Sequence, residues 1–295
     1  MSGPGQLRQL LEGDDIVIAP GVYDGLSARI ATAAGFSALY CSGGAVARSS
    51  GVPDLGLLTM TEVLARLREV IDATSLPVIA DADTGYGNAV NVVRTVREFE
   101  RLGAAAIHLE DQVAPKKCGH YAGQELISAG EMVQKLRAAV DTRKEMLIIA
   151  RTDARGQVGL DEAIRRGRLY AEAGADIVFI EAPTSREEIE TIARSVDAPL
   201  LINMFEGGRT PLIPAAELAA MGYRLMVVPS DLQRAAIRAM ELVAEVLRRD
   251  GSSAAIRDRL ASFAERDAIV NLAAWTELDA QYADTTRAGE PPAGG

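Results

Sequence analysis

Short apolar segments rich in β-branched residues recur along the chain, and they constrain its fold more than any other feature. Segments with the periodicity of amphipathic helices separate them, including 90–102, 131–140, 161–173 and 186–196. Near-continuous apolar strands that alternate with helices are typical of parallel sheets covered by helices. The eight predicted strands are 16–20, 38–43, 78–83, 106–111, 147–153, 177–182, 200–204 and 224–230.

The number and spacing of these units predict an α/β fold of the (β/α)₈ or TIM-barrel type. Eight units within about 250 residues favour a closed barrel over an open doubly wound sheet. No predicted strand is followed by the GxGxxG turn of a dinucleotide-binding sheet. Glycine precedes four strands, where a left-handed residue ends a helix and turns the chain back. These glycines are Gly35, Gly103, Gly174 and Gly222.

The C-terminal part of the sequence exceeds what a barrel needs. We expect a catalytic barrel over residues 1–250, a helical oligomerisation extension over 251–285 and a disordered tail over 286–295. The amphipathic segment 254–282 carries an apolar face that has no place on a barrel and therefore needs a partner. The extension is thus predicted to mediate self-association.

Charge and composition narrow the classes of partner. The 295 residues carry a formal net charge of −10, which disfavours nucleic acid and anionic membranes as partners but not a small anionic substrate. Residues 1–15 contain no apolar stretch of signal-peptide length, and no window is long and apolar enough for a membrane span. We therefore expect a cytoplasmic protein whose two cysteines, Cys41 and Cys118, remain thiols.

The scarcity of two residue types limits the chemistry. Two histidines are too few for a multi-histidine zinc or iron site. The four lysines all lie outside the apolar strands, whereas a Schiff-base enzyme normally presents a desolvated lysine from a rigid element. A hard metal ion held by oxygen ligands becomes the natural alternative.

Acidic residues gather at the carboxyl ends of the predicted strands, where barrel enzymes place their sites. Two carboxylates about 4 Å apart repel by roughly 4 kcal/mol at an effective dielectric near 20, so a cluster requires a cation. Mg²⁺ suits such a cluster because it takes carboxylates and leaves positions for a chelating substrate. For any single acid, pairing with Arg151 or capping of a helix explains it equally well. The acids are Asp54, Asp81, Asp83, Glu110, Asp111, Asp153 and Glu181.

A cysteine follows the fourth strand in a loop with two lysines, glycine and histidine. Cations stabilise a thiolate, so the sequence predicts that Cys118 takes part in proton transfer. Cys41 and His108 lie inside apolar strands, and we interpret both as structural. The run 42–44 offers backbone N–H groups to a carboxylate, although an ordinary turn explains it equally well.

Taken together, these motifs resemble the isocitrate lyase/phosphoenolpyruvate mutase superfamily from about residue 15 to about residue 275. Patterns similar to these occur in methylisocitrate lyases, in 2-alkylmalate lyases with oxaloacetate hydrolases, and in carboxyphosphonoenolpyruvate mutases. The Lys-Lys-Cys-Gly-His run indicates the lyase branch. The resemblance implies a barrel whose C-terminal helix is swapped between the subunits of a homotetramer. The motifs lie at 40–44, 51–56, 81–87, 109–112, 116–120, 150–153 and 203–211.

The resemblance also implies metal and catalytic residues. Asp81 and Asp83 would hold Mg²⁺, or Mn²⁺, directly or through water, with Asp54 and Glu110 behind them. Cys118 would protonate the departing carbanion. The catalytic set would further include Tyr40, for the proton of the alkoxide, and His120.

Ten residues are expected to bind the substrate by the same resemblance. Arg234 and Arg266 match arginines that take extra carboxylates in methylisocitrate lyases, although both also suit an arginine-rich surface. Asp231 departs from the common pattern and would repel a polycarboxylate. The others are Ser42, Gly43 and Gly44 with Arg151 for one carboxylate, and Gly119, Glu181, Asn203 and Thr210 around the rest of the substrate.

The predicted function is that of a Mg²⁺-dependent carbon–carbon lyase. It would cleave a 2-hydroxy di- or tricarboxylate, similar to 2-methylisocitrate or a 2-alkylmalate, to a 2-oxo acid and a second carboxylate. Three alternatives remain at this point: a carboxyphosphonoenolpyruvate-type phosphonomutase, an oxaloacetate hydrolase or decarboxylase, and a carboxylate-binding barrel without catalysis. A barrel that only senses a carboxylate needs no proton donor, so Cys118 argues against the last.

Overall fold

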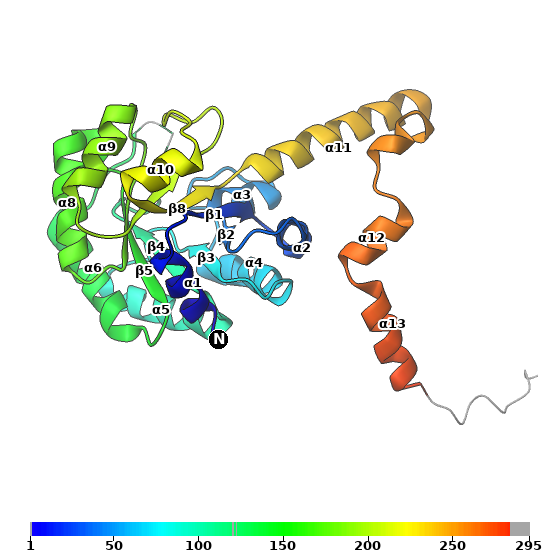
Figure 1. Cartoon of the computed structure of the whole chain (residues 1–295), viewed down its shortest axis with the longest axis horizontal. Coiled ribbons are helices and arrows are strands. Elements are labelled where there is room, and N and C mark those ends of the chain that lie inside the picture. The colour runs from blue at the N-terminus through cyan, green and yellow to red at the C-terminus, as the bar shows by residue number, and fades with distance from the viewer. Residues whose placement is uncertain (1, 120, 122, 284–295) are drawn as a thin grey trace, which may run out of the picture. The chain divides into compact units, whose positions relative to one another are not determined.

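The eight apolar segments form eight parallel strands that close into a barrel (Figure 1). The computed structural model describes residues 2–119, 121 and 123–283. Neighbours in the chain pair with each other around the barrel, and β1 closes it by pairing with β8 from Val17–Leu225 to Pro20–Val228. The predicted TIM barrel is confirmed. The strands are β1 (Val17–Val22), β2 (Leu39–Cys41), β3 (Val78–Asp81), β4 (Ala106–Glu110), β5 (Leu147–Thr152), β6 (Ile177–Ile180), β7 (Leu200–Asn203) and β8 (Tyr223–Val228).

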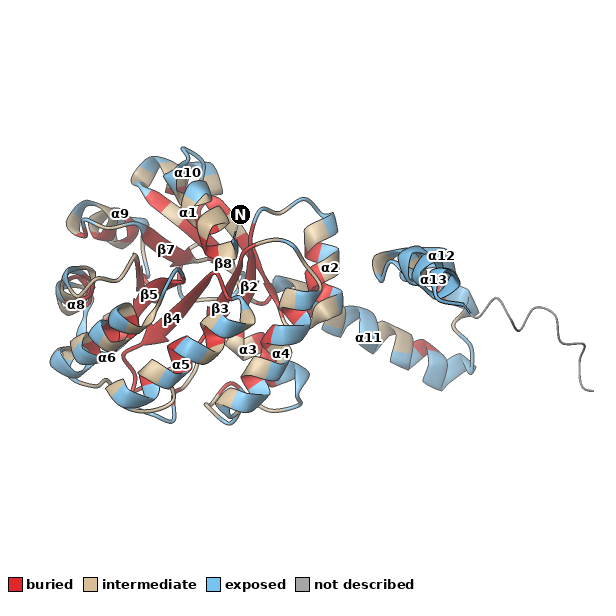
Figure 2. Ribbon diagram, turned by 90° about the horizontal axis from the view of Figure 1, so that it is seen from below, coloured by how far each residue is buried: buried red, intermediate tan, exposed pale blue. Residues whose placement is uncertain are grey.

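Helices cover the outside of the barrel and present their exposed faces to solvent (Figure 2). The four segments predicted as helices from their periodicity correspond to α5, α6, α8 and α9. The helices described up to residue 250 are α1 (Gly3–Glu12), α2 (Gly25–Ala33), α3 (Gly43–Ser49), α4 (Met60–Asp72), α5 (Ala89–Leu102), α6 (Ala129–Thr142), α7 (Ala154–Val158), α8 (Leu160–Glu172), α9 (Arg186–Ser195), α10 (Ala215–Met221) and α11 (Asp231–Asp250).

Successive residues of each strand point alternately into the barrel and out toward the helices. On β2, Tyr40 joins the core inside the barrel, whereas Leu39 and Cys41 pack in the core beneath the helices. Ile79 on β3 likewise faces inward and Val78 outward. The interpretation of Cys41 as a core residue is therefore confirmed, and this alternation decides which polar residues at the strand ends share the barrel mouth.

The four glycines that precede strands all have the left-handed backbone expected of them. Their φ angles are 87° at Gly35, 101° at Gly103, 98° at Gly174 and 103° at Gly222. A side chain with a β-carbon is strained in this region, so glycine is the residue that turns each helix back toward the barrel.

The first helix, which the sequence analysis did not predict, contributes to the core inside the barrel. Ser2 caps α1 by accepting a hydrogen bond from the Gly5 N–H. Pro4 lies in the first turn, where a backbone N–H would have no partner within the helix, so the N–H that proline lacks is not needed. Leu7 is fully buried among inward-facing residues of the strands. In the described part of the chain, no helix combines the length and the hydropathy that a membrane span requires.

The chain divides into two compact units, and the second begins at Glu241 and is described as far as residue 283. The sequence suggested a single amphipathic segment after α11. The described part of the second unit instead contains three short elements there. Ser262 starts α12 with a capping box that includes Glu265, and Asn271, with a φ of 55°, separates α12 from α13. These elements are η1 (Ala254–Arg259), α12 (Phe263–Ile269) and α13 (Leu272–Gln281).

Asp111, one of the acids at the strand ends, points away from the barrel mouth and joins β4 to the helices. It is fully buried and pairs with Arg166 of α8 at 2.8 Å. It also accepts hydrogen bonds from Tyr170 Oη at 2.8 Å, Thr152 Oγ1 at 2.7 Å and the Asp153 N–H at 3.0 Å. Every acceptor position is used by the scaffold, so Asp111 is a structural residue.

Replacing Asp111 with alanine leaves the Arg166 guanidinium with one carboxylate, the partly exposed Glu162 at 2.9 Å. Removing one partner of a buried ion pair costs about 3–5 kcal/mol, so with this second partner in place we expect the free energy of unfolding to fall by up to that amount. Urea denaturation followed by circular dichroism measures it. The matched control is Glu190→Ala, whose carboxylate pairs with Arg186 and Arg194 on the exposed face of α9, and this change should cost less than about 1 kcal/mol. Equal losses in both variants would contradict the structural role of Asp111.

Candidate active site

A cavity of about 440 Å³ opens at the carboxyl ends of the strands, a size suited to a small ligand. The alternation of side chains along the strands explains its polar lining. Asp81, Arg151 and Glu181 each lie two positions after an inward-facing residue of their strand. Eleven of the residues predicted for the site line this cavity, namely Tyr40, Ser42, Gly44, Asp54, Asp81, Cys118, Gly119, Arg151, Glu181, Asn203 and Arg234.

Lys116 lies between the acidic residues predicted to hold the metal. Its Nζ is 2.6 Å from Asp54 Oδ1 and 2.8 Å from Asp83 Oδ1. The pKa of Lys116 is raised well above its ordinary value, because the charges of these carboxylates outweigh burial, which acts in the opposite direction. The sequence analysis treated this lysine only as a neighbour of Cys118, yet its ammonium group occupies the centre of the acidic cluster.

Two aspartates of this cluster have opposite pKa shifts. Burial would raise the pKa of Asp81, but His108, Lys116 and Arg151 together lower it to about 2. Burial and the neighbouring Asp81 raise the pKa of Asp83 to about 6, against the attraction of Lys116. Asp81 Oδ1 also accepts a hydrogen bond from the Asp83 N–H at 2.9 Å, which holds the two residues together.

Tyr40 and His108 lie beneath Asp81 and contact each other. Tyr40 Oη is 2.8 Å from His108 Nε2 and donates toward Asp81 Oδ2 at 3.4 Å. Burial lowers the pKa of His108 to about 4, so the ring is neutral near pH 7. The sequence analysis interpreted His108 as purely structural, whereas the structure gives it direct contact with two residues of the predicted site.

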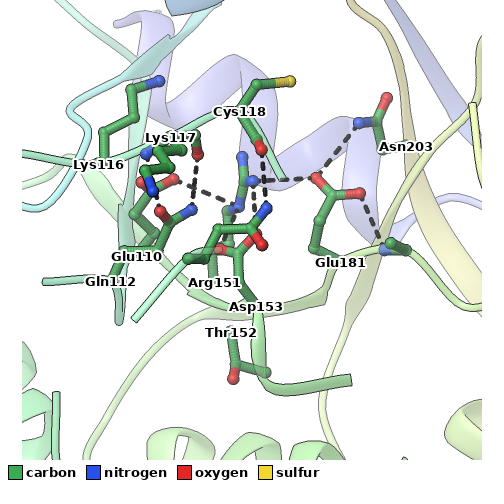
Figure 3. A network of polar contacts seen from close by, with 12 residues as sticks. Glu110, Gln112, Lys116, Lys117, Cys118, Arg151, Thr152, Asp153, Glu181 and Asn203 are labelled. Carbon is green, nitrogen blue, oxygen red and sulfur yellow. Dashed lines mark hydrogen bonds and ion pairs between the residues drawn. The ribbon is translucent and has the colours of Figure 1, made fainter. Parts of the chain in front are cut away.

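Arg151 organises the other side of the cavity (Figure 3). Its guanidinium donates to both oxygens of Asp153, at 3.0 and 2.9 Å, and lies 3.2 Å from Glu181 Oε2 and 3.4 Å from Glu110 Oε2. Asn203 Nδ2 donates to Glu181 Oε2 at 3.3 Å. Arg151 thus lies within ion-pair distance of three buried carboxylates.

The loop that carries Cys118 packs directly onto this network. A β-carbon at Gly119 would lie 2.6 Å from Arg151 Nη2 and 2.7 Å from Asp153 Oδ1, so only glycine permits the approach. Gln112 fixes the loop through two hydrogen bonds of 2.9 Å with the backbone of Lys117, and Gln124 donates to the Cys118 carbonyl at 2.8 Å. The Cys118 N–H donates to the Asp54 carbonyl at 3.2 Å. His120 lies outside the described residues.

Several buried polar atoms at the site have no hydrogen-bond partner among the described residues. They include both carboxylate oxygens of Glu110, His108 Nδ1, Asn203 Oδ1 and Thr210 Oγ1. Burial raises the pKa of Glu110 well above its ordinary value, against the charges of Arg151 and Lys116. Such atoms are costly unless a ligand or ion satisfies them, which fits a site that binds one.

The donor set suits a hard cation, although the described residues bring no three metal ligands around a single point. The ammonium group of Lys116 already places a positive charge between Asp54 and Asp83. The unsatisfied oxygens of Glu110 add a further acceptor near Arg151. The position therefore favours a cation, and the acidic residues present are oxygen donors of the kind Mg²⁺ takes.

Of the other predicted residues that the structure describes, Gly43, Asp83, Glu110, Thr210 and Arg266 do not line the cavity, and Arg234 lines it with its guanidinium already bonded. Gly43 lies beneath it, with the position of a β-carbon 2.5 Å from Asp81 Oδ2. Arg234 contacts Asp231 Oδ1 at 3.7 Å and donates to the Glu206 carbonyl at 2.5 Å. Arg266 belongs to α12 of the second unit, where it pairs with Asp267 at 2.8 Å and lies over the Phe263 ring.

The sequence analysis missed Arg48, Lys116, Tyr121, Phe205 and Ile237, which also line the cavity. Arg48 had a detectable signal, because it follows Gly44 by four residues and so shares its face of the helix. Phe205 and Ile237 had none, because apolar residues at such positions are equally typical of a core.

The comparisons with known proteins agree with this geometry. A sequence profile of the family described as phosphoenolpyruvate phosphomutase matches residues 7–248. The chain is 47% identical over 286 residues to 2,3-dimethylmalate lyase of Eubacterium barkeri, covering 96% of this chain and 99% of the relative. It is 47% identical over 284 residues to 2-methylisocitrate lyase of Aeropyrum pernix, covering 96% and 91%.

Among solved structures, a 2,3-dimethylmalate lyase of the PEP mutase/isocitrate lyase superfamily superimposes with a TM-score of 0.91 and 40% identity, covering 99% of both chains. The barrel therefore has its counterpart in a known enzyme family. The chain belongs to the phosphoenolpyruvate phosphomutase family, within the PEP mutase/isocitrate lyase superfamily.

Proposed function

We propose that this protein is a metal-dependent carbon–carbon lyase that cleaves a 2-hydroxy di- or tricarboxylate to a 2-oxo acid and a second carboxylate. The observation that carries the proposal is that a thiol, Cys118, and a buried acidic cluster line the same cavity. Cleavage between C2 and C3 starts from an alkoxide at C2 and leaves the bonding electron pair on C3, and the two features match these two needs: cations near the alkoxide and a proton donor for C3. The relatives that are lyases of 2,3-dimethylmalate and 2-methylisocitrate support the same reaction class.

Mg²⁺ is the metal we propose, with Mn²⁺ as a substitute. Asp81 and Asp83 are the residues that would hold it, with Asp54 and Glu110 behind them. When bound, such an ion would stabilise the negative charge of the C2 alkoxide from which the 2-oxo acid forms. The attraction between the ion and the carboxylates would also offset the repulsion among these acids.

The remaining site residues position the substrate. Ser42, Gly43 and Gly44 are assigned to the carboxylate beside C2, with Arg151 near it. The fragment that departs is assigned to Gly119, Glu181, Asn203 and Thr210, and Arg234 and Arg266 are proposed as further candidates to bind it. Asn203 and Thr210 have buried oxygens without a partner among the described residues.

We assign proton transfer at C2 to Tyr40 and proton transfer at C3 to Cys118. Tyr40 Oη takes the proton of the C2 hydroxyl and passes its own toward His108 or Asp81, both of which it contacts. Burial raises the pKa of Tyr40 well above its ordinary value, so a relay is favoured over a lasting phenolate. Cys118 gives its proton to the carbanion at C3, and His120 is proposed as a member of the same set.

We also propose that the enzyme is a cytoplasmic homotetramer and that residues 251–285 serve assembly by exchanging helices between subunits. Large apolar side chains of α12 and α13 support this proposal, since Phe263 is 76% exposed and Trp275 is 64% exposed. Burying such residues in an interface removes apolar area from water.

The proposed activity is tested by the release of a 2-oxo acid from a panel of substrates. The panel contains 2-methylisocitrate, 2-alkylmalates, 2,3-dimethylmalate, oxaloacetate and a phosphonopyruvate. We expect turnover of a 2-hydroxy acid that requires Mg²⁺ or Mn²⁺ and stops after chelation. Turnover of oxaloacetate or the phosphonate alone, or full activity in chelator, would overturn the proposal.

Lys116→Met removes the ammonium group from the acidic cluster. Asp54 and Asp83 then lose their buried counter-ion, and at about pH 8 we expect the metal-free variant to lose up to about 3–5 kcal/mol of unfolding free energy. Mg²⁺ should restore more stability to this variant than to the wild type, because ion and lysine compensate the same acids. Thermal unfolding with and without Mg²⁺ measures both effects.

Lys117→Met is the matched control, because Lys117 Nζ donates only to the Gly123 carbonyl among the contacts found, at 2.7 Å. Its stability and its response to Mg²⁺ should stay close to those of the wild type. If Mg²⁺ raised the stability of both lysine variants equally, the ammonium group of Lys116 and the ion would not compensate the same acids.

Cys118→Ser tests the proton donor. General acid catalysis is worth about 10²- to 10⁴-fold, so we expect kcat to fall by that factor while KM changes little. Steady-state kinetics on the best substrate measure the two constants. Cys41→Ala is the control: burial raises the pKa of Cys41 to about 12, and its loss should lower stability but not kcat. A serine variant with full activity would remove Cys118 from the mechanism.

A further inference from the structure

The backbone beside the thiol is held by the side chain of a buried glutamine. Gln112 is only 1% exposed, and its amide makes two hydrogen bonds with a single residue of the cysteine loop (Figure 3). Its Nε2 donates to the Lys117 carbonyl at 2.9 Å, and its Oε1 accepts from the Lys117 N–H, also at 2.9 Å. Because an amide donates and accepts at the same time, this pair of bonds fixes the direction of the backbone as well as its position.

Gln112 is itself held at the end of a barrel strand. It follows β4 by two residues and forms an antiparallel bridge with Leu126. The Val113 N–H donates to the Glu125 carbonyl at 2.8 Å, so the two ends of the loop 113–125 lie side by side. The amide of Gln112 therefore ties the middle of the loop to the barrel by a second connection besides the chain itself.

The residue that Gln112 holds lies between two groups of the site. Lys116 reaches into the acidic cluster, and Cys118 lines the cavity. A change in the backbone direction at Lys117 therefore displaces both neighbours. As the structure describes it, Gln112 lies outside the cavity lining, so it acts on a ligand only through the loop.

Two further contacts hold Cys118, and neither carries a charge. Its carbonyl accepts from Gln124 Nε2 at 2.8 Å, and its N–H donates to the Asp54 carbonyl at 3.2 Å. Gln124 in turn accepts a hydrogen bond from Gln157 of α7. Together with the two bonds of Gln112, these neutral contacts hold the backbone at the thiol whether or not a metal ion changes the charge of the acidic cluster.

We infer that Gln112 is a positioning residue for proton transfer, which holds the backbone of Lys117 in the direction that turns the Cys118 thiol toward the ligand. The inference rests on the proposed lyase function, in which Cys118 protonates C3. A proton donor must lie within hydrogen-bond reach of its acceptor, and a displacement of about 1 Å can cost about 100-fold in rate. The residues assigned to the substrate do not include Gln112, so its loss should lower kcat more than it changes KM.

The first test measures the thiol itself and needs no turnover. Iodoacetamide labelling of Cys118 is timed by mass spectrometry with and without saturating Mg²⁺ and oxalate, a small dicarboxylate that resembles a 2-oxo acid. The ratio of the two rates is the protection that the ligand gives, and it reports whether the thiol faces the ligand. We expect protection of at least about 10-fold in the wild type and less than about 3-fold in Gln112→Leu, because access controls the labelling of a thiol.

Steady-state kinetics on the best substrate supply the second test. Gln112→Leu should lower kcat by about 10- to 100-fold and change KM by less than about 3-fold. Gln112→Glu, when ionised, still accepts from the Lys117 N–H but no longer donates to the Lys117 carbonyl, so its effects on protection and kcat should be intermediate. The glutamate variant also decides the question if the leucine variant does not fold.

Tyr223→Phe is the matched control. It removes a buried hydrogen bond of 3.1 Å to the Ile189 carbonyl at the start of β8, away from the cavity lining. This change should lower the Tm, as the loss of the Gln112 bonds should, but leave both the protection of Cys118 and kcat at their wild-type values.

Each outcome decides the inference. Wild-type protection and kcat in the Gln112 variants would overturn it and leave the lyase function intact, and so would a change in only one of the two readouts. Equal loss of protection in Tyr223→Phe, or a wild type that the ligand does not protect, would overturn it as well. A protected wild type that turned over no 2-hydroxy acid would instead refute the proposed function, while labelling would still show whether Gln112 holds the thiol.

Discussion

The balance of buried charge at the barrel mouth is the constraint on which the rest of this site depends. Asp81, Glu110 and Glu181 project inward because the strands alternate, and a cluster of this kind repels itself strongly in a poorly solvated place. Two cations make the arrangement stable. Arg151 compensates the acids of β4, β5 and β6, and Lys116 compensates those near β3.

This charge balance is linked to the loop that carries the thiol. Lys116 reaches the acidic cluster from that loop, and the Cys118 N–H bonds to the Asp54 carbonyl. Gly119 packs against Arg151 at a distance that excludes any side chain. The position of Cys118 is therefore set by the same contacts that organise the acids.

Selectivity for the substrate depends on which cations remain available after the protein has satisfied its own acids. Arg234 has a suitable place on the cavity wall but already contacts Asp231 and the Glu206 carbonyl. Arg48 donates to the neutral amide of Gln233 instead.

The sequence by itself determined the barrel and most of the cavity lining. Apolar β-branched runs, glycines such as Gly103 and acids at strand ends are local signals, and periodicity alone decides which strand residues share a face. Only the tertiary structure decided the partners of the charged groups and the break in the segment after α11. Lys116 meets Asp54 across 62 positions and Arg48 meets Gln233 across 185, so no local pattern encodes either pair. Pairing over such distances is set by the closure of the barrel, which brings all the strand ends to one place.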